Sequence, residues 1–409
     1  MRVLIYEHAS AGGFTDGSVS PGILAEGFGM LRSAVSGFKA AGHQVTVLLA
    51  AGLSKYNPPL NADCVIPVFS SMEARDALRK ACETVDAAYI MAPETGGTLQ
   101  SLVELVEQTG VASLNCQSSV IQNVADKAVL YENLKKKGLP TPESVVFNIL
   151  DDLADIKKAI KRQLSYPVVF KPLDGVGCGG LSIVSDESQV AAGIAKVKAE
   201  SASGSFVVQE YVGGEAASVS LLSTGTKALP VSLNKQEVTI GAPNEVSSYD
   251  GGHVPFEHAL KREAFGVAEE VVGCFGGLRG YVGVDLVLTD KKPVVVDVNP
   301  RLTTSFVGLS KVAKFNVCGA LMNAVLEGEL PATTYIQGFA CFAKVQTSKP
   351  TSSALQRLYG LEGIVSPPFP ISGYSNACAI VSSQGDTLAE AAGRLEEAKR
   401  HTLDIVNRG

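Results

Sequence analysis

The first part of the chain alternates short apolar runs with longer stretches in which apolar residues recur at helical spacing. The runs that predict buried strands lie at residues 3–6, 45–50, 64–68 and 87–92. Ser20, followed by a proline, is typical of a helix start, and Gly42 of a helix end. Strands and helices in this order predict a parallel, Rossmann-like α/β layer over residues 1–117.

The pattern changes near Leu139-Pro-Thr-Pro142, because two closely spaced prolines end the preceding helix. Beyond this point strands and helices no longer alternate regularly, which predicts an α+β fold. The expected units are a small subdomain at 118–204, a second subdomain at 205–331 with a helix at Glu257–Gly276, and a C-terminal extension at 332–409 that packs on them.

Two runs rich in β-branched residues, Tyr281–Leu288 and Pro293–Asn299, predict a hairpin. If Thr289 pairs with the first residue of the second strand, Asp285 lies directly opposite Asp297. Like charges in this position are destabilising unless a cation lies between them.

Asn299 is expected on the same face as the two aspartates, two residues beyond the second. Two carboxylates and an amide are hard oxygen ligands, which suit Mg²⁺ together with substrate phosphates. Arg301 follows and offers a planar fork to a phosphate or carboxylate. Solvated charges at strand ends would give the same pattern, and a one-residue slip would place Asp285 on the other face.

A lysine, Lys171, lies inside the apolar run Val168–Pro172, where burial is costly unless an anion meets it. The glycine-rich segment Leu173–Gly180 follows and leads into another strand, unlike a P-loop or a dinucleotide-binding turn. Together they predict a flap over a triphosphate, although a plain flexible turn would fit the loop alone.

The run from Val207 to Glu215 ends in two glycines flanked by carboxylates. The backbone near Tyr211 and Val212 could read an adenine edge, and Glu215 could accept hydrogen bonds from ribose hydroxyls. Solvated glutamates at a strand end, Glu210 among them, would produce the same sequence.

Charge and composition exclude several classes of protein. A net charge of −6 argues against nucleic acid as a partner, and the chain has no apolar run long enough to span a bilayer. Its eight cysteines are scattered without a Cys-x-x-Cys pair, which favours reduced thiols in the cytoplasm. No Gly-x-Gly-x-x-Gly turn opens a helix, so an oxidoreductase is not favoured.

The order of these elements, beginning with Asp126-Lys127, resembles the ATP-grasp superfamily over about residues 118–330. The upstream layer resembles the pre-ATP-grasp domain. The resemblance implies phosphate contacts from two lysines and the flap: Lys127, Lys171, Gly175, Gly177, Gly179 and Gly180. It implies an adenine and ribose site: Glu210, Tyr211, Val212 and Glu215. It implies ligands for two Mg²⁺ ions, for which Mn²⁺ could substitute: Asp285, Asp297 and Asn299.

The resemblance also implies catalytic roles for Arg301 and Lys171, which would stabilise the transferring phosphoryl group. An ATP-grasp ligase phosphorylates a carboxylate, and an amine then displaces phosphate from the acyl phosphate. Such chemistry needs charge neutralisation and exclusion of water more than a side-chain nucleophile. The superfamily more often has glutamate where this chain has Asp297, whose side chain is one methylene shorter and therefore less suited to bidentate bridging of two ions.

Residues that could select the substrates follow from their chemistry and position, although each could be an ordinary loop residue. The hydroxyls and amides that could orient a carboxylate belong to Thr303, Thr304, Ser305, Asn234 and Gln236. The two glutamates that could hold an ammonium group are Glu94 and Glu7.

The opening Tyr6-Glu-His segment, the Ala92–Gly97 loop and the Asn299–Ser305 segment look like tyramine–glutamate ligases of methanofuran biosynthesis. That resemblance implies glutamate and an aromatic amine as substrates and allows a homodimer. A ligase or carboxylase with another acid and amine, or a non-catalytic ATP-binding protein, are the alternatives.

Overall fold

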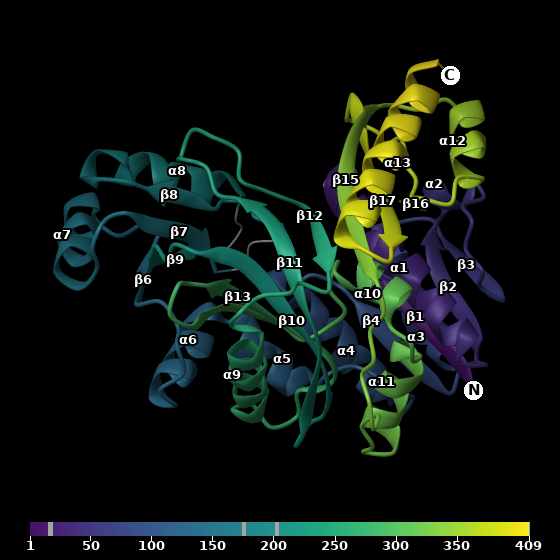
Figure 1. Cartoon of the computed structure of the whole chain (residues 1–409), viewed down its shortest axis with the longest axis horizontal. Coiled ribbons are helices and arrows are strands. Elements are labelled where there is room, and N and C mark those ends of the chain that lie inside the picture. Colours follow the sequence, from purple (N-terminus) through teal and green to yellow (C-terminus); the bar gives the residue numbers. More distant parts are fainter. Residues whose placement is uncertain (15–18, 174–176, 201–203, 409) are drawn as a thin grey trace.

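The computed structural model describes residues 1–14, 19–173, 177–200 and 204–408, and Figure 1 shows three layers built around separate sheets. The first is a parallel sheet of order β3-β2-β1-β4-β5. Its strands are β1 (Arg2–Glu7), β2 (Gln44–Ala50), β3 (Cys64–Val68), β4 (Ala87–Met91) and β5 (Ala112–Ser113). Its helices are α1 (Pro21–Ala40), α2 (Ala51–Ser54), α3 (Ser71–Cys82), η1 (Thr95–Gly97) and α4 (Thr98–Thr109). The predicted Rossmann-like layer is therefore confirmed.

The start of α1 follows the predicted signal. Ser20 caps the helix by accepting a hydrogen bond from the backbone N–H of Ile23, and Pro21 occupies the first turn, where its missing N–H costs nothing. The first turns of this helix line the cavity described below.

The second layer is an antiparallel sheet of order β6-β9-β7-β8. Its strands are β6 (Ser144–Asn148), β7 (Val168–Pro172), β8 (Ser182–Val184) and β9 (Ser205–Glu210). The helices of this part of the chain are α5 (Ser118–Ala125), α6 (Lys127–Lys136), α7 (Leu153–Gln163), η2 (Glu187–Gln189) and α8 (Val190–Glu200). Because β9 pairs with β6 and β7, this sheet extends to Glu210, beyond the boundary expected at residue 204.

The third layer is an eight-stranded sheet of order β14-β13-β10-β11-β12-β15-β17-β16. Its strands are β10 (Glu215–Thr224), β11 (Ala228–Thr239), β12 (Ser248–Val254), β13 (Arg279–Leu288), β14 (Pro293–Asn299), β15 (Phe339–Ser348), β16 (Ile364–Ser366) and β17 (Asn376–Gly385). The helices are α9 (Lys261–Gly273), α10 (Phe306–Val312), α11 (Val317–Leu326), α12 (Ser352–Tyr359) and α13 (Leu388–Arg408).

The C-terminal extension continues this sheet. β15 pairs with β12, so the segment from residue 332 is joined to the central strands by backbone hydrogen bonds as well as by packing. The helix expected at Glu257–Gly276 is shorter, because the N–H of Leu260 donates to Nδ1 of His258 in a turn that precedes α9.

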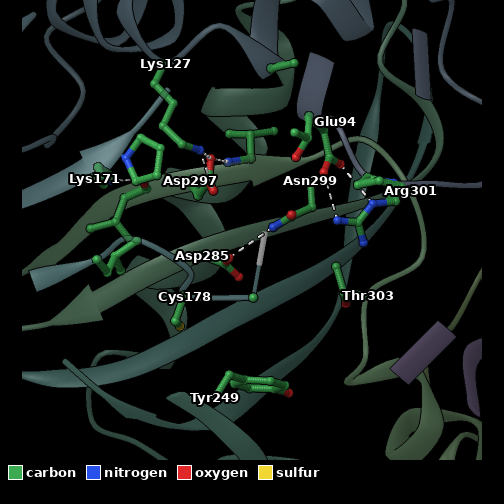
Figure 2. A pocket seen from close by; sticks show the side chains of 18 of the residues that line it. Glu94, Lys127, Lys171, Cys178, Tyr249, Asp285, Asp297, Asn299, Arg301 and Thr303 are labelled. Carbon is green, nitrogen blue, oxygen red and sulfur yellow. Dashed lines mark hydrogen bonds and ion pairs between the residues drawn. The ribbon is translucent and has the colours of Figure 1, made fainter. Parts of the chain in front are cut away.

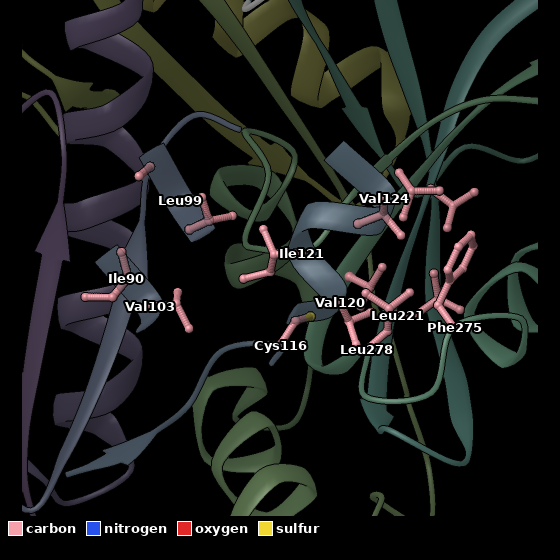
Figure 3. Close-up of a cluster of buried hydrophobic side chains, with 14 of the residues drawn as sticks. Ile90, Leu99, Val103, Cys116, Val120, Ile121, Val124, Leu221, Phe275 and Leu278 are labelled. Atoms are coloured by element: carbon pink, nitrogen blue, oxygen red, sulfur yellow. The ribbon is translucent and has the colours of Figure 1, made fainter. Parts of the chain in front are cut away.

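A shared core joins the first layer to the large sheet (Figure 3). Side chains of α5, among them Val120, Ile121 and Val124, pack between Ile90, Leu99 and Val103 on one side and Leu221, Phe275 and Leu278 on the other. Because all of these side chains are buried, the core fixes the position of the first layer relative to the strands that carry Asp285 and Asp297. Within the described part of the chain, no helix is long and apolar enough to cross a membrane. All eight cysteines are free thiols.

Candidate active site

A cavity of about 630 Å³ lies where the three layers meet. Most of the residues singled out from the sequence line it: Glu7, Glu94, Lys127, Lys171, Gly177, Glu210, Tyr211, Val212, Gln236, Asp285, Asp297, Asn299, Arg301, Thr303, Thr304 and Ser305. Four do not line it: Gly179, Gly180, Glu215 and Asn234. Gly175 lies outside the described residues.

The β13–β14 hairpin places Asp285 opposite Asp297, as predicted, and Asn299 two residues further on. The turn is one residue longer than expected, because Leu288, and not Thr289, pairs with Pro293. A β-bulge between Asp285 and Leu286 compensates for the difference, since it leaves Val296 without a partner. The bulge therefore returns both aspartates to one face.

Asp285 is tied to that face by two amides. Nδ2 of Asn299 donates to Oδ2 of Asp285 over 3.0 Å, and Nε2 of Gln236 donates to Oδ1 over 3.1 Å (Figure 2). Burial, together with the charge of Asp297, raises the pKa of Asp285 to about 6. This carboxylate is therefore held in position while its charge lacks full compensation.

Asp297 has a cationic partner, Lys127 at the start of α6. The ammonium donates to both carboxylate oxygens, over 3.0 and 2.9 Å. Burial opposes the charge of Asp297, but Lys127 and then Lys171 outweigh it and lower the pKa of the carboxyl. Figure 2 shows the side chain of Lys127 pointing toward Asp297.

The two aspartates and Asn299 fit Mg²⁺, because they present hard oxygens on one face and one carboxylate lacks full charge compensation. Within the described ranges, no group of three or more His, Cys, Asp or Glu side chains could hold a metal ion. The coordination shell would therefore have to be completed by phosphate oxygens and water, which is usual for Mg²⁺.

Lys171 lies on β7 with its side chain buried. Its ammonium donates to the hydroxyl of Tyr131 over 2.6 Å, and that hydroxyl donates to the carbonyl of Val296 over 2.8 Å. Burial, with the charge of Lys127 adding to it, lowers the pKa of Lys171 to about 7. A triphosphate entering the cavity would meet two lysines whose charges repel each other.

The glycine-rich segment forms the connection between β7 and β8. Gly177 and Cys178 line the cavity and have φ of 59° and 70°, a region that L side chains rarely adopt. At Gly180, an added Cβ would come within 2.7 Å of the ring of Pro172. Positive φ thus favours glycine at both Gly177 and Gly180, and close packing against Pro172 leaves no room for a side chain at Gly180.

The opposite end of the cavity carries Arg301 and Glu94, which form a two-pronged ion pair. Nη2 of Arg301 donates to Oε2 of Glu94 over 2.9 Å, and Nε lies 2.9 Å from Oε1 (Figure 2). This geometry fixes the plane of the guanidinium group. Arg301 is therefore held at the wall of the cavity beyond the two aspartates.

Glu7 is buried at the end of β1. Its carboxylate accepts hydrogen bonds from the backbone N–H groups of Ala9, over 3.0 Å, and Ser10, over 2.7 Å. Burial raises its pKa, which the hydrogen bonds from Ser10 oppose. Among the described residues, no cationic side chain pairs with it at ion-pair distance. Gly27 of α1 makes room for it, since an added Cβ there would lie 2.5 Å from the carboxyl atoms.

Comparison with known proteins agrees with this geometry. A family model described as an ATP-grasp domain matches residues 124–305, and a pre ATP-grasp 3 domain matches residues 43–121. The tyramine–L-glutamate ligase of Methanocaldococcus fervens is 31% identical over 310 residues, 75% of this chain and 89% of that protein. The tyramine–L-glutamate ligase of Methanocaldococcus jannaschii is 29% identical over 312 residues, 75% and 84% of the two chains.

The chain belongs to the ATP-grasp family of carboxylate–amine ligases. It is an enzyme of the class that forms carbon–nitrogen bonds, and enzymes of this superfamily generally use ATP with Mg²⁺.

Solved structures show the same fold. An ATP-grasp superfamily protein from Archaeoglobus fulgidus superposes with a TM-score of 0.63 at 23% identity, over 93% of this chain and 99% of that one. The L-amino acid ligase of Bacillus licheniformis superposes with a TM-score of 0.68 at 16% identity, over 98% and 97%. At these identities the likeness concerns the fold alone.

Two predicted site residues of this ligase have other partners. The Glu215 carboxylate forms an ion pair with Lys235 at 2.9 Å and lies near His258. Glu215 is exposed at the start of β10. Asn234 is fully buried in a network with Ser218, Ser220, Ser232 and Ser305, so its amide supports the large sheet below the cavity.

Sequence reasoning missed several residues that line the cavity or contact its lining. Tyr131 holds Lys171, while Glu26 and Tyr249 line the wall, and Lys344 pairs with Glu26. Tyr131 follows Lys127 by one helical turn, so the two side chains lie on the same face of α6. This spacing was the signal in the sequence that could have predicted Tyr131 beside the lysines. No local sequence pattern predicts that Glu26 contacts Lys344.

Proposed function

We propose that this ligase joins the γ-carboxyl of glutamate to the amine of tyramine or a related aromatic amine, releasing ADP and phosphate. The reaction would pass through a γ-glutamyl phosphate. The similarity to tyramine–L-glutamate ligases over most of their length supports both the acid and the amine.

The observation that carries the proposal is the composition of the cavity. One end of the cavity carries the lysines and aspartates. At the other end, the Glu7 carboxylate lies among apolar side chains. These apolar residues are Ala9, Phe14, Ile23, Met30 and Met91. An apolar wall around a buried carboxylate is suited to an aromatic body that carries an ammonium group.

In the first step, a γ-carboxylate oxygen of glutamate attacks the terminal phosphorus of ATP, and ADP leaves. Lys127 and Lys171 neutralise the phosphates, and Arg301 stabilises the transferring group. Mg²⁺, held by Asp285, Asp297 and Asn299, would supply further neutralisation of phosphate charge when bound.

In the second step, the amine nitrogen attacks the acyl carbon. Phosphate leaves with the oxygen that came from the carboxylate, and the nitrogen loses a proton. Glu7 is the proposed acceptor for this proton, because its carboxylate lines the cavity without a cationic partner among the described side chains. Glu94 holds Arg301 in the orientation that both steps need.

The remaining site proposals concern the nucleotide and the ions. Glu210 and the backbone of Tyr211 and Val212 would hold adenine, which their place in the cavity wall supports. Glu215 would bind the ribose only by exchanging Lys235 for the hydroxyls. Two Mg²⁺ ions, for which Mn²⁺ could substitute, complete the proposal.

A homodimer in the cytoplasm is proposed as the working state of the enzyme. Free thiols at all eight cysteines support a reducing compartment. Phe69 and Met72, which are 75% and 87% exposed beside the edge strand β3, support a surface where two copies meet. Light scattering of the purified chain tests the dimer.

The test of the function is ADP release with Mg-ATP and glutamate across a panel of amines that includes tyramine, tyrosine and ammonia. Release that requires both glutamate and one aromatic amine is expected. Release with another acid in place of glutamate would refute the proposed acid, and release with ammonia alone would refute the aromatic amine.

A further inference from the structure

A third ion pair lies at the wall of the cavity, next to the segment that carries Arg301. Glu26 of α1 and Lys344 of β15 are in direct contact, with side chains that are 15% and 13% exposed. The ammonium of Lys344 also lies 5.5 Å from the ring centroid of Tyr249. Glu26 and Tyr249 line the cavity, and the ammonium of Lys344 lies directly against both, one side chain back from the lining.

This pair is linked to the catalytic loop. The hydroxyl of Thr304 donates to Oε2 of Glu26 over 2.7 Å, and Thr304 is itself buried. Thr304 lies three residues after Arg301, so the two positions are at most about 10 Å apart along an extended chain. A molecule of glutamate, about 5 Å between its two carboxyl carbons and with a hydrogen bond of about 3 Å at each end, spans a separation of this size.

Stability alone does not account for an ion pair in this place. Removing two charges from water costs about as much as their attraction returns, so a buried pair adds little net stability. At a cavity wall, the same pair presents a cation and an anion side by side. The groups that match it are an ammonium and a carboxylate on neighbouring atoms.

We infer that Glu26 and Lys344 form the binding site for the α-amino and α-carboxylate groups of the amino-acid substrate. The α-ammonium is bound by Glu26, and the α-carboxylate is bound by Lys344. The γ-carboxyl then points toward Arg301 and the phosphates. This inference rests on the proposed function, because it takes the acid substrate to be glutamate.

The site selects amino acids over simple acids for a physical reason. Glutarate lacks the α-ammonium and would leave Glu26 without its ligand, whereas 4-aminobutyrate lacks the α-carboxylate and would leave Lys344 without its ligand. A charge-assisted hydrogen bond lost in a desolvated site costs about 10- to 100-fold in affinity. The C-terminal extension, which supplies Lys344, would thus contribute directly to specificity.

The experiment measures the dissociation constants of glutamate, glutarate and 4-aminobutyrate by calorimetry. The enzyme is saturated with Mg²⁺ and a non-hydrolysable ATP analogue, so neither turnover nor the amine is needed. Lys344→Met should weaken glutamate binding by about 10- to 100-fold but change 4-aminobutyrate binding less than about twofold. Glu26→Gln should weaken glutamate binding similarly and leave glutarate nearly unchanged.

Lys399→Met and Glu396→Gln are the matched controls, because these residues form an exposed ion pair on α13 of the same extension. Neither should change any of the three constants. Lys344→Arg, which keeps the charge, should recover most of the glutamate affinity. Thermal unfolding of each variant shows that the fold is retained.

Equal losses for glutamate and its truncated analogues would overturn the inference and give the pair a structural role only. If glutamate-dependent ADP release persists in that case, the proposed function stands without the inference. If the wild-type enzyme binds no glutamate and releases no ADP with it, both are wrong.

Discussion

Asp285 lies directly opposite Asp297 across the β13–β14 hairpin because Val296, the residue before Asp297, has no partner on β13. Without this bulge, Asp285 would face Val296, and the two aspartates would point to opposite sides of the sheet. The bulge also turns the carbonyl of Val296 toward Tyr131 and Lys171. One extra residue therefore places both the proposed metal ligands and the lysine proposed to bind phosphate.

Asp297→Asn should raise the Mg²⁺ concentration needed for half-maximal ADP release by at least about tenfold. The amide keeps the shape of the side chain but removes the charge that a divalent ion and Lys127 both require. A Mg²⁺ titration at fixed ATP measures the effect. Asp290→Asn, in the exposed turn of the same hairpin, is the control, and equal behaviour of the two variants would contradict the metal assignment.

Lys171→Met should lower kcat/KM for ATP by about 100- to 1,000-fold, the loss expected when one charged donor to a developing charge is removed. Lys291→Met, which changes an exposed lysine of the hairpin turn, should have no effect. Steady-state kinetics at saturating glutamate and amine measure both. Turnover within threefold of the wild-type enzyme would refute the role of Lys171.

The same lysine predicts proton uptake on nucleotide binding. Its pKa is about 7 in the nucleotide-free protein, so at pH 8.5 it is mostly neutral. A triphosphate favours the charged form and raises this pKa, so ATP binding takes up a proton and weakens as pH rises above 7.

Calorimetry in buffers of different ionisation enthalpy measures the number of protons taken up. At pH 8.5 the wild-type enzyme should take up more protons per ATP than Lys171→Met. At pH 6 the difference should vanish, because Lys171 is then already charged in the free protein. Equal uptake at pH 8.5 would show that another group titrates.

Gly27→Ala should raise KM for the amine and leave KM for ATP unchanged. The added methyl would lie 2.5 Å from the carboxyl of Glu7, which would have to shift toward the cavity and lose its backbone hydrogen bonds. Gly266→Ala in α9 is the control, because nothing lies within 4 Å of the added atom. An unchanged KM for the amine would argue against Glu7 as the group that meets it.

The sequence was sufficient to predict elements whose signals are local. The parallel first layer followed from its strand and helix alternation, and the opposition of Asp285 and Asp297 followed from strand pattern. The bulge could not be foreseen, because the longer turn, whose backbone bonds to Thr289, and the unpaired Val296 shift the register in opposite directions. The predicted pairing of the aspartates was right although the predicted turn was wrong.

Long-range contacts were beyond the reach of sequence patterns. Lys344 meets Glu26 only because β15 joins β12 and continues the large sheet alongside α1. Asn234 reads as a polar strand residue in the sequence, yet its neighbours on β10 are serines, so its amide is satisfied inside the sheet. Both outcomes depend on strand order, which a single sequence does not encode locally.

The most direct test of the account uses glutamate labelled with ¹⁸O in its γ-carboxyl, together with Mg-ATP and tyramine. Mass spectrometry of the products should show an amide of glutamate with tyramine and one ¹⁸O atom in each phosphate released, because phosphate leaves with the carboxylate oxygen. ADP formed with unlabelled phosphate and no amide would contradict the activation of glutamate by this enzyme.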